Sequence, residues 1–354
     1  MTPLGRIIAD RIRAAGPISI ADYMADCLMH PHHGYYATRD PFGAAGDFTT
    51  APEISQMFGE LLGLCLAHAW LDQGAPAPLV LAELGPGRGT LMKDALRATA
   101  RVPGFHAALS IHLVEASPHL RQVQAATLVG HQPHWHDSAA SLPDAPLFLI
   151  ANEFFDALPI RQFRRTRDGW CEHLVGMTDD TLTLGLSSPL PASTLGHRLA
   201  DTAPGEVVEL CPALPAVIAE LADRIARHGG TALVVDYGGW QSRGDTFQAL
   251  RQHSPTSPLA EPGLADLTAH VDFAAIAAAA APAACSVMGT QGTLLARLGI
   301  GPRAEKLALT LQGPALTSHH AAFHRLTDPA EMGNLFKAVA LYPKGAPVPP
   351  GFDA

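Results

Sequence analysis

The residues best suited to do chemistry follow an apolar run near residue 80. This stretch, Leu79-Val-Leu-Ala-Glu-Leu-Gly-Pro-Gly-Arg-Gly-Thr90, carries an acid, Glu83, and then glycines at 85, 87 and 89. An apolar run bounded by glycine is typical of a strand buried on both faces of a parallel sheet. Glycine lets the chain turn sharply and approach a ligand with no Cβ in the way. The stretch therefore predicts a site for a nucleotide-type cofactor.

The glycine spacing separates two cofactor classes. A dinucleotide fold uses G-x-G-x-x-G, so that a helix N-terminus meets a pyrophosphate. Here the spacing is G-x-G-x-G, with Glu83 two residues before the first glycine, which matches the pattern of S-adenosyl-L-methionine (SAM)-dependent methyltransferases. Because SAM carries a positive sulfonium and an amino group, an acid at the strand end is electrostatically favourable. NAD is the less favoured alternative.

Three further strand ends carry polar side chains. Glu115 ends the second, where an acid can accept hydrogen bonds from both ribose hydroxyls of NAD or SAM alike. Asp137 and Ser138 follow the third, where an adenine edge would lie, although a plain turn residue is an equal alternative for Asp137. Asn152 and Glu153 follow the fourth. Because ligands bind beyond the carboxyl ends of parallel strands, this pair is expected to face the reacting centre; helix capping is its alternative.

These residues need a regular α/β core to position them. Strands are expected at 79–84, 109–115, 134–136 and 147–152, with helices at 91–100 and 118–129. This alternation implies a parallel sheet with right-handed crossovers. Next come a hairpin around Asp168-Gly169, strands at 181–186, 207–210 and 232–236, a helix at 215–228, a loop-like stretch at 241–270, helices at 273–281 and 291–298, and a strand at 336–341.

The residues before this core are expected to be helices and a loop. Two short helices separated by Gly16-Pro17 are predicted within residues 1–30, and a glycine- and proline-rich loop spans 40–53. A helix is then expected, with Thr50 or Ala51 at its boundary and Pro52 and Glu53 in its first turn. A transit peptide is the alternative for the first residues, but Asp10 and the lack of serines oppose it.

Composition excludes several classes of protein. The net charge is −9, and no basic stripe stands out in the sequence. Both observations argue against a nucleic-acid partner. Five scattered cysteines without a CxxC pair indicate a reducing compartment. No metal site is predicted, although some of the 18 histidines form clusters at 30–33, 131–136 and 319–320. No apolar run approaches the roughly 20 residues that span a bilayer.

Taken together, the motifs resemble those of the MidA family of class I SAM-dependent methyltransferases, which includes mitochondrial members that help assemble respiratory complex I. The motifs that carry the resemblance are HPHHGYY at 30–36, GDFTTAPEISQ at 46–56, ELGPGRGTLM at 83–92, VEASP at 114–118, ANEFFDALP at 151–159, DLTAHVDF at 266–273 and MGNLFK at 332–337. They run in order over almost the whole chain. The family often has Asn-Pro where this chain has His30-Pro31.

The resemblance implies a Rossmann-like α/β fold with a mostly parallel seven-stranded sheet. An N-terminal helical extension is expected over 1–75 and a SAM-binding core over 76–354, with hairpin and helical insertions around 160–210 and 240–330. The cofactor-binding residues expected are Glu83, Gly85, Pro86, Gly87, Gly89, Glu115, Asp137, Ser138, Asn152, Thr50 and Pro52. The loop and helix start at 46–56 are expected to close over the cofactor.

The resemblance also implies methyl transfer to an arginine of a complex I core subunit, so a protein substrate is the expected partner. Because a guanidinium has a very high pKa, it cannot simply be deprotonated beforehand, and carboxylates can hold it and accept its proton as the new bond forms. Glu153 is the first candidate and Asp156 the second, with Asn152 beside them and Asp47 and Glu53 on the preceding loop. Asp156 as a helix cap and Glu53 as a complement to the helix dipole are the alternatives.

Several questions stay open at the level of sequence. In the late motif, Asp266 and His270 either line a substrate channel or order a loop. Another nucleophile, or a non-catalytic assembly chaperone, is the alternative function, and a homodimer is an open alternative to a monomer. The compartment expected is the cytoplasm of a bacterium or the mitochondrial matrix of a eukaryote.

Overall fold

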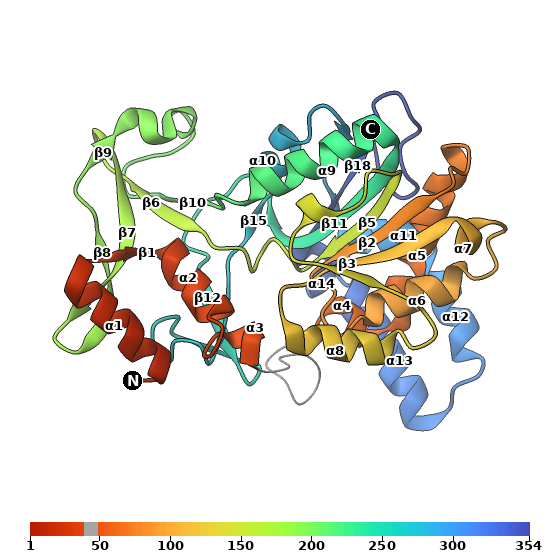
Figure 1. Cartoon of the computed structure of the whole chain (residues 1–354), viewed down its shortest axis with the longest axis horizontal. Coiled ribbons are helices and arrows are strands. Elements are labelled where there is room, and N and C mark those ends of the chain that lie inside the picture. Colours follow the sequence, from red (N-terminus) through yellow and green to blue (C-terminus); the bar gives the residue numbers. More distant parts are fainter. Residues whose placement is uncertain (39–48) are drawn as a thin grey trace. The chain divides into compact units, whose positions relative to one another are not determined.

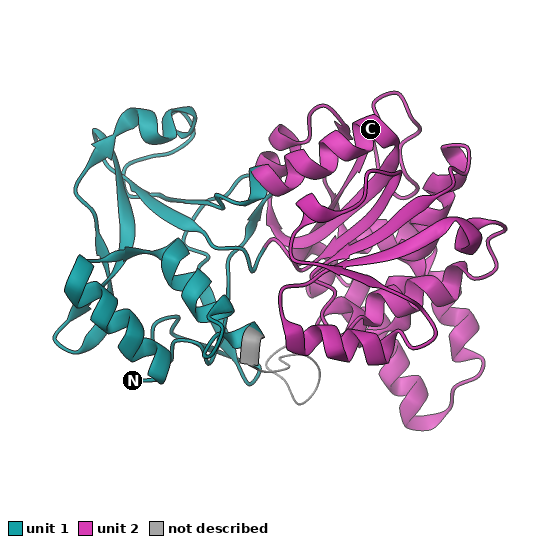
Figure 2. Cartoon of the chain, viewed as in Figure 1, with its two compact units in different colours: residues 1–48, 156–215, 241–272 teal, residues 49–155, 216–240, 273–354 magenta. Residues whose placement is uncertain are grey.

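A computed structural model describes residues 1–38 and 49–354 of the chain (Figure 1). The chain forms two compact units, and it passes between them several times (Figure 2). The first contains residues 1–48, 156–215 and 241–272, and the second contains residues 49–155, 216–240 and 273–354. The sequence-based division at residue 75 stays a prediction.

The second unit is built on a sheet with the strand order β16-β18-β11-β5-β2-β3-β4. The strands are β2 (Leu79–Leu84), β3 (Leu109–Val114), β4 (His134–His136), β5 (Leu147–Asn152), β11 (Gly230–Gly239), β16 (Ala284–Cys285) and β18 (Phe336–Tyr342), and the short β17 (Gly289–Thr290) also pairs with β18. The pairs from β4 to β11 are parallel, whereas β18 runs antiparallel to β11. The predicted mostly parallel α/β sheet is confirmed.

The second unit also contains helices, several of which contact the sheet. They are α4 (Ala51–Ile54), α5 (Gln56–Asp72), α6 (Thr90–Thr99), α7 (Phe105–Ala108), α8 (Pro118–Thr127), η1 (Ala139–Ser141), α9 (Leu214–His228, which begins in the first unit), α10 (Phe273–Ala279), α11 (Gln291–Arg297), α12 (Ile300–Ala308), α13 (Gly313–Thr327) and α14 (Met332–Leu335). The predicted helices at 91–100, 118–129, 215–228, 273–281 and 291–298 are confirmed within a few residues at their ends.

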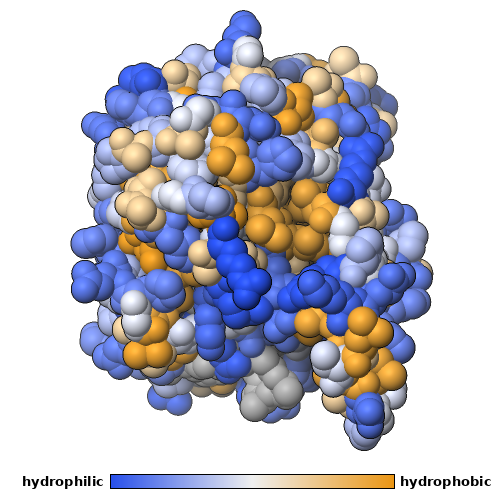
Figure 3. Space-filling model, turned by 90° about the vertical axis from the view of Figure 1, so that its right-hand side faces the viewer, coloured by the Kyte–Doolittle hydropathy of each residue, from blue (hydrophilic) through white to orange (hydrophobic). Residues whose placement is uncertain are grey.

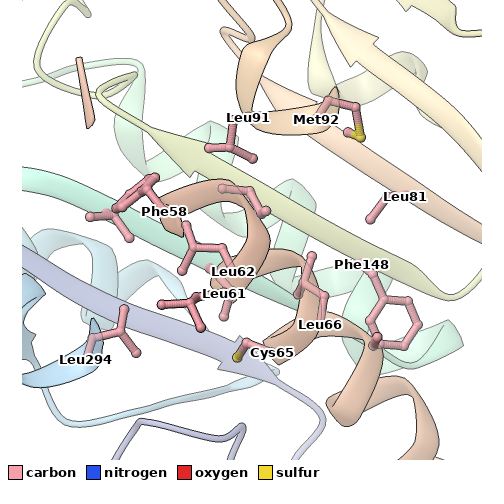
Figure 4. Close-up of a cluster of buried hydrophobic side chains, with 14 of the residues drawn as sticks. Phe58, Leu61, Leu62, Cys65, Leu66, Leu81, Leu91, Met92, Phe148 and Leu294 are labelled. Carbon is pink, nitrogen blue, oxygen red and sulfur yellow. The ribbon is translucent and has the colours of Figure 1, made fainter. Parts of the chain in front are cut away.

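The core of this unit is centred on α5. Leu61, Leu62 and Leu66 are at most 5% exposed and pack in one cluster with Phe148 of β5 (Figure 4). A Cβ on Gly63 would lie 2.6 Å from Cβ of Ala95 on α6. Glycine is therefore what lets α5 approach α6, the helix that follows the glycine turn.

The single helix predicted from Pro52 onward is wrong in one respect. The backbone is extended at Ser55 (φ −158°, ψ 136°), which ends the one-turn helix α4 and begins α5. The hydroxyl of Ser55 accepts a hydrogen bond from the N–H of Met57 at 3.2 Å. Serine competes with the helix for backbone donors in this way, and it starts a new helix instead of continuing the old one.

The first unit combines two sheets with the N-terminal helices. Its elements are α1 (Pro3–Ala15), β1 (Ile18–Ser19), α2 (Ile20–Met29), α3 (Tyr35–Thr38), β6 (Arg161–Arg165), β7 (Gly169–Thr178), β8 (Thr181–Leu186), β9 (Leu190–Pro191), η2 (Ala192–Arg198), β10 (Val207–Leu210), β12 (Gln248–Arg251), β13 (Ser254–Thr256), β14 (Asp266–Thr268) and β15 (Val271–Asp272). The antiparallel pairing of β6 with β7 confirms the predicted hairpin. The loop predicted at 241–270 is wrong in part, because β12, β13 and β14 form a three-stranded sheet.

In the part of the chain that the structure describes, no helix is long and apolar enough to cross a bilayer. Large apolar side chains are exposed at separate places, among them Val129 and Leu309. Figure 3 shows apolar areas interrupted by hydrophilic ones on the face that it draws.

Candidate functional site

The carboxyl ends of β2, β3, β5 and β11 form one edge of the parallel sheet (Figure 1). The register pairs Leu84 with both Val114 and Ala151, and Asn152 with Val235. The polar residues that end these strands are therefore neighbours. Ligands of open α/β sheets bind at such an edge.

The glycine turn after β2 requires glycine at three positions. Gly85, Gly87 and Gly89 have φ of 60°, 53° and 80°, in the left-handed region that side chains disfavour. A Cβ on Gly85 would also lie 2.9 Å from Cδ2 of Phe154. The turn is closed by a hydrogen bond from the N–H of Gly89 to the carbonyl of Pro86 at 2.7 Å. The strand end, the turn and the start of α6 are thus as the sequence predicted.

Glu83 lies at the end of β2 and is only 3% exposed. Burial raises the pKa of Glu83 to about 8, although a hydrogen bond from the backbone of Met92 works in the opposite direction. Among the described residues, no donor reaches its Oε2. A buried carboxylate oxygen without a donor is costly unless a cation or donor is supplied. This side chain therefore fits a ligand that carries positive charge.

Glu115 follows β3, and several hydrogen bonds hold its side chain. Its Oε1 accepts a hydrogen bond from the N–H of Ser117 at 2.8 Å, and its Oε2 accepts one from Nε2 of Gln124 at 3.1 Å. Burial raises the pKa of Glu115, and these hydrogen bonds oppose that shift. The carboxylate is therefore fixed in direction at the sheet edge, as a ribose ligand would need.

Sequence reasoning missed Gln124 of α8. Its amide also donates to the carbonyl of Gly87 at 2.8 Å and accepts from Nε1 of Trp135 at 2.8 Å, so it connects the ends of β2, β3 and β4. The side chain is fully buried. A signal was available, because Gln124 stands four residues after Leu120 on the inward face of the helix. A polar side chain at such a position needs partners.

The predicted adenine-side residues lie at the end of β4. The Asp137 side chain is 90% exposed and pairs with Arg121, whose Nε donates to the carbonyl of Glu115 at 2.7 Å. The carbonyl of Ser138 accepts a hydrogen bond from the hydroxyl of Ser141 at 2.9 Å. The roles of Asp137 and Ser138 stay predictions.

Asn152 and Glu153 end β5. Asn152 is buried, and its Nδ2 donates to Oε1 of Glu153 at 3.0 Å. Within the described chain its Oδ1 has no donor. Glu153 has φ of 51°, which is unfavourable for a residue with a side chain. No helix follows the pair, so the helix-capping alternative is wrong, and two groups with hydrogen-bonding capacity are concentrated at the edge.

The segment before α5, residues 50–55, also contacts this site. The N–H of Ala51 donates to Oε1 of Glu153 at 3.1 Å. Glu53 accepts a hydrogen bond from the hydroxyl of Thr90 and lies 3.7 Å from a guanidinium nitrogen of Arg88. The structure therefore ties Glu53 to the glycine turn. Asp47 lies outside the described residues.

Thr50 and Pro52 begin this segment. The carbonyl of Thr50 accepts from the N–H of Glu53 at 3.0 Å, which forms the first turn of α4, and Pro52 stands in that turn. The predicted helix boundary is confirmed. The predicted cofactor contact of these two residues stays a prediction.

Asp156 belongs to the first unit and is buried. No helix begins at Asp156, so the capping alternative is wrong for it too. Its carbonyl accepts from the N–H of Ala269 at 3.0 Å. In the same unit the Tyr36 hydroxyl donates to Asp266 at 2.8 Å, and burial together with Asp266 and Asp156 raises the Tyr36 pKa.

His270 supports the loop-ordering interpretation of the late motif. Its N–H donates to the hydroxyl of Thr246 at 2.9 Å, and Thr246 in turn bonds to the buried carboxylate of Glu209. These contacts anchor the segment before β12 to β10. The motif is therefore explained in part by packing within the first unit.

His136, from the 131–136 histidine cluster, is hydrogen-bonded to a histidine outside it. Nδ1 of His112 lies 2.8 Å from Nε2 of His136 on the neighbouring strand. Burial lowers the pKa of His112 to about 4. No group of three or more possible metal-ligating side chains occurs within residues 1–38 and 49–354.

Comparison with known proteins gives consistent matches. A model of the S-adenosyl-L-methionine-dependent methyltransferase family matches residues 61–291. The chain is 38% identical over 360 residues to a Danio rerio protein named protein arginine methyltransferase NDUFAF7, mitochondrial, covering 93% of this chain and 84% of the relative. The Homo sapiens protein of that name is 36% identical over 373 residues, covering 97% and 84%.

A solved structure is similar over nearly the whole chain. It is the crystal structure of a Burkholderia thailandensis protein bound to S-adenosyl-homocysteine, with a TM-score of 0.84 and 27% identity. The match covers 98% of this chain and 94% of that one. The related protein therefore carries the demethylated form of SAM on a chain of the same fold.

Proposed function

Because this chain belongs to the S-adenosyl-L-methionine-dependent methyltransferase family, we propose that it methylates an arginine side chain of a protein. It is an enzyme, and its cofactor is SAM. The arginine acceptor is supported by the name of the relatives, protein arginine methyltransferase NDUFAF7. The observation that carries the proposal is the carboxylate of Glu153, held at the end of β5 in a strained backbone conformation.

The proposed cofactor site follows the edge of the sheet. The backbone of Gly85, Pro86, Gly87 and Gly89 lines it, and the buried Glu83 supplies negative charge for the cationic cofactor. The fit rests on the carboxylate Oε2 of Glu83 and the amide Oδ1 of Asn152, which lack donors among the described residues.

The remaining cofactor contacts extend along the same edge. Glu115 would hold the ribose hydroxyls, and Asp137 and Ser138 would hold the adenine. Thr50, Pro52 and Asn152 would complete the cofactor site. Gln124 keeps Glu115 pointed toward the ribose through its amide.

Methyl transfer needs alignment more than covalent chemistry from the protein. When bound, SAM supplies a methyl group whose carbon–sulfur bond breaks as a bond to a guanidine nitrogen forms, and the electron pair of the broken bond goes to sulfur. Glu153 holds the guanidinium and accepts its proton during transfer. Asn152 fixes that carboxylate through Nδ2, while Asp156, three residues further on, is the second candidate acid.

Glu53 and Asp47 are the weaker candidates for this role. Glu53 already contacts Thr90 and Arg88 of the glycine turn, which favours a part in holding the cofactor site together. We therefore propose that Glu53 supports the structure of the cofactor site and does not take part in methyl transfer.

The protein acceptor proposed is a core subunit of respiratory complex I, as the family resemblance implies. The curated relatives carry the word mitochondrial in their names. The proposed compartment is accordingly the mitochondrial matrix in a eukaryote and the cytoplasm in a bacterium. A homodimer is compatible with the proposal and is not required by it.

Mass spectrometry of complex I core subunits from cells with and without this protein tests the acceptor. Loss of one methylated arginine is expected without it, and unchanged arginine methylation would contradict complex I as the methyl acceptor.

The Glu153→Gln variant tests the catalytic role of Glu153 in an assay with purified protein. We expect turnover about 100-fold lower, since general bases contribute about 10²–10⁴, with SAM affinity retained. Full turnover would remove Glu153 from the mechanism.

A further inference from the structure

Asp236 is a fully buried carboxylate near the end of β11 with no part in the cofactor site described above. Its Oδ2 accepts hydrogen bonds from the backbone N–H of Phe154 at 3.1 Å and of Phe155 at 2.9 Å. Its Oδ1 accepts from the N–H of Tyr237 at 3.0 Å. One side chain therefore binds the turn after β5 to the neighbouring strand.

The turn that Asp236 holds has no regular structure of its own. The N–H of Glu153 donates to the carbonyl of Val235 at 3.0 Å, so three consecutive amides of the turn, 153 to 155, point at the end of β11. This arrangement goes with the left-handed φ of 51° at Glu153. Such conformations persist when the surrounding structure determines them. Asp236 accepts two of the three hydrogen bonds that do so, both through Oδ2.

The other end of Glu153 is held separately. Its Oε1 accepts from the N–H of Ala51 and from Nδ2 of Asn152. The backbone is thus fixed by β11 and the carboxylate by α4 and β5. Losing the first set would let the turn relax toward an ordinary conformation and would move the carboxylate.

From these contacts we propose that Asp236 is a positioning residue for methyl transfer, acting through Glu153. The proposal rests on the proposed role of Glu153 in that reaction. It predicts that Asp236 affects the transfer step more than cofactor affinity, because the three hydrogen bonds described above hold the backbone next to Glu153, and none of them is made to the glycine turn or to Glu115. A purely structural side chain would instead lower the amount of folded enzyme without changing the turnover of the folded part.

The first test compares Asp236→Ala with Asp236→Asn. The alanine variant is expected to lower turnover at saturating SAM about 100-fold, the loss that a misplacement of about 1 Å can cause. The asparagine variant keeps one oxygen acceptor for Phe154 and Phe155, and it is expected to recover at least about a tenth of the wild-type turnover. Calorimetric titration with SAM is expected to give dissociation constants within about threefold of wild type.

Glu209→Gln is the matched control. Glu209 is also a buried carboxylate, 2% exposed, that accepts from backbone N–H groups, those of Thr246 and Phe247, but it lies within the first unit. It is expected to change thermal stability without changing turnover per folded molecule. Equal turnover losses in the Glu209 and Asp236 variants would overturn the positioning role, as would a SAM affinity more than tenfold weaker in Asp236→Asn.

A double-mutant cycle with Glu153→Gln completes the test. If Asp236 acts through Glu153, the double variant is expected to be no slower than Glu153→Gln alone, because residues that act as a unit are not additive. Losses that multiply would overturn the inference while leaving Glu153 in place. Full turnover of Glu153→Gln alone would instead contradict the proposed function, so the two failures are distinguishable. If Asp236→Ala does not fold, Asp236→Asn takes its place in the cycle.

Discussion

The N–H of Ala51 donates a hydrogen bond to Oε1 of Glu153 at 3.1 Å, although the two residues are 102 positions apart in the chain. This bond connects the one-turn helix α4 to the end of β5. On its other side α4 is connected to the glycine turn, because Glu53 contacts Thr90 and Arg88. The one-turn helix α4 therefore connects the glycine turn after β2 with Glu153 at the end of β5.

The contacts of Glu53 predict a role in cofactor binding and not in transfer. Glu53→Gln removes the charge that faces Arg88 and weakens the acceptor of the Thr90 hydroxyl. A hydrogen bond to a charged group contributes about 1.5–3 kcal/mol, so SAM affinity is expected to fall about tenfold or more, while turnover at saturating SAM changes less than about threefold.

Calorimetric titration and steady-state kinetics separate the two effects. Thr90→Val is the matched control, because it removes the same hydrogen bond and keeps the Glu53 charge. A loss of turnover at saturating SAM as large as that of Glu153→Gln would place Glu53 among the catalytic residues instead.

Glu83 predicts an unusual dependence of stability on pH. The pKa of Glu83 is about 8 in the folded protein, against 4.5 for an ordinary glutamate. Between those values the native state keeps a proton that the unfolded state has lost. The stability of the cofactor-free protein therefore falls as pH rises from 4.5 to 8, by up to about 1.4 kcal/mol per pH unit from this group.

Urea denaturation of wild type and Glu83→Gln at several pH values measures this contribution. The free energy of unfolding of Glu83→Gln, relative to that of the wild type, is expected to increase from pH 5 to pH 8. A difference that does not change with pH would exclude Glu83 as the source of the pH dependence. Cofactor binding is expected to favour the ionised form of Glu83 over the protonated form, because a nearby cation stabilises a carboxylate. SAM affinity of the wild type is therefore expected to rise with pH up to about 8, with a weaker dependence in Glu83→Gln.

Gln124 is expected to matter for both stability and affinity. Replacement by leucine leaves the carbonyl of Gly87, Oε2 of Glu115 and the indole N–H of Trp135 without this partner. Each buried polar group left in this way costs about 1–3 kcal/mol. Gln124→Leu is therefore expected to lower the free energy of unfolding by about 3 kcal/mol or more and SAM affinity more than tenfold.

Gln122→Leu provides the comparison for Gln124, because Gln122 is exposed on the same helix. It is expected to change stability by less than about 0.5 kcal/mol and to leave SAM affinity unchanged. Chemical denaturation and calorimetry measure both variants. Equal effects of the two substitutions would mean that the hydrogen bonds of the buried Gln124 side chain contribute nothing specific to stability or to SAM affinity.

The sequence was sufficient for the elements that carry their own pattern. The buried strands β2 and β5 are continuous apolar runs, and the acid at Glu83 with its glycines marks the turn that follows. The helix α13 has no such pattern, because Leu326 is its one buried residue among those the structure describes. The strands β12 to β14 are three or four residues long, too short for their periodicity to stand out.

The residues that hold the site together were harder to predict. Asp236 is recognisable only once β11 lies beside β5, because it binds backbone amides 81 and 82 positions earlier in the chain. Gln124 likewise acquires its meaning from Gly87 and Trp135, which come from two different strand ends. Local patterns can indicate which residues face a ligand. They do not contain the long-range pairings that fix those residues in place.

The close approach of Gly85 to Phe154 gives the last prediction. Gly85→Ala places a side chain at a φ of 60°, which costs roughly 1 kcal/mol, and puts a Cβ 2.9 Å from the aromatic ring. Gly74 is a matched control, because its φ is 84° and nothing lies within 4 Å of the position of its Cβ. Gly74→Ala is therefore expected to show only the backbone cost. Gly85→Ala must in addition displace Phe154, which adjoins Glu153 in the chain.

The two alanine variants should thus differ in function more than in stability. Urea denaturation is expected to show a loss of about 1 kcal/mol for Gly74→Ala and about 1–3 kcal/mol more for Gly85→Ala, the usual range for overpacking. SAM affinity and turnover are expected to fall at least about tenfold in Gly85→Ala alone, since small misplacements at a reacting centre are costly. Adding Phe154→Leu to Gly85→Ala is expected to restore part of both, because leucine gives way where the ring cannot. If the second substitution gives no recovery, crowding against Phe154 is not the reason that glycine is required at this position.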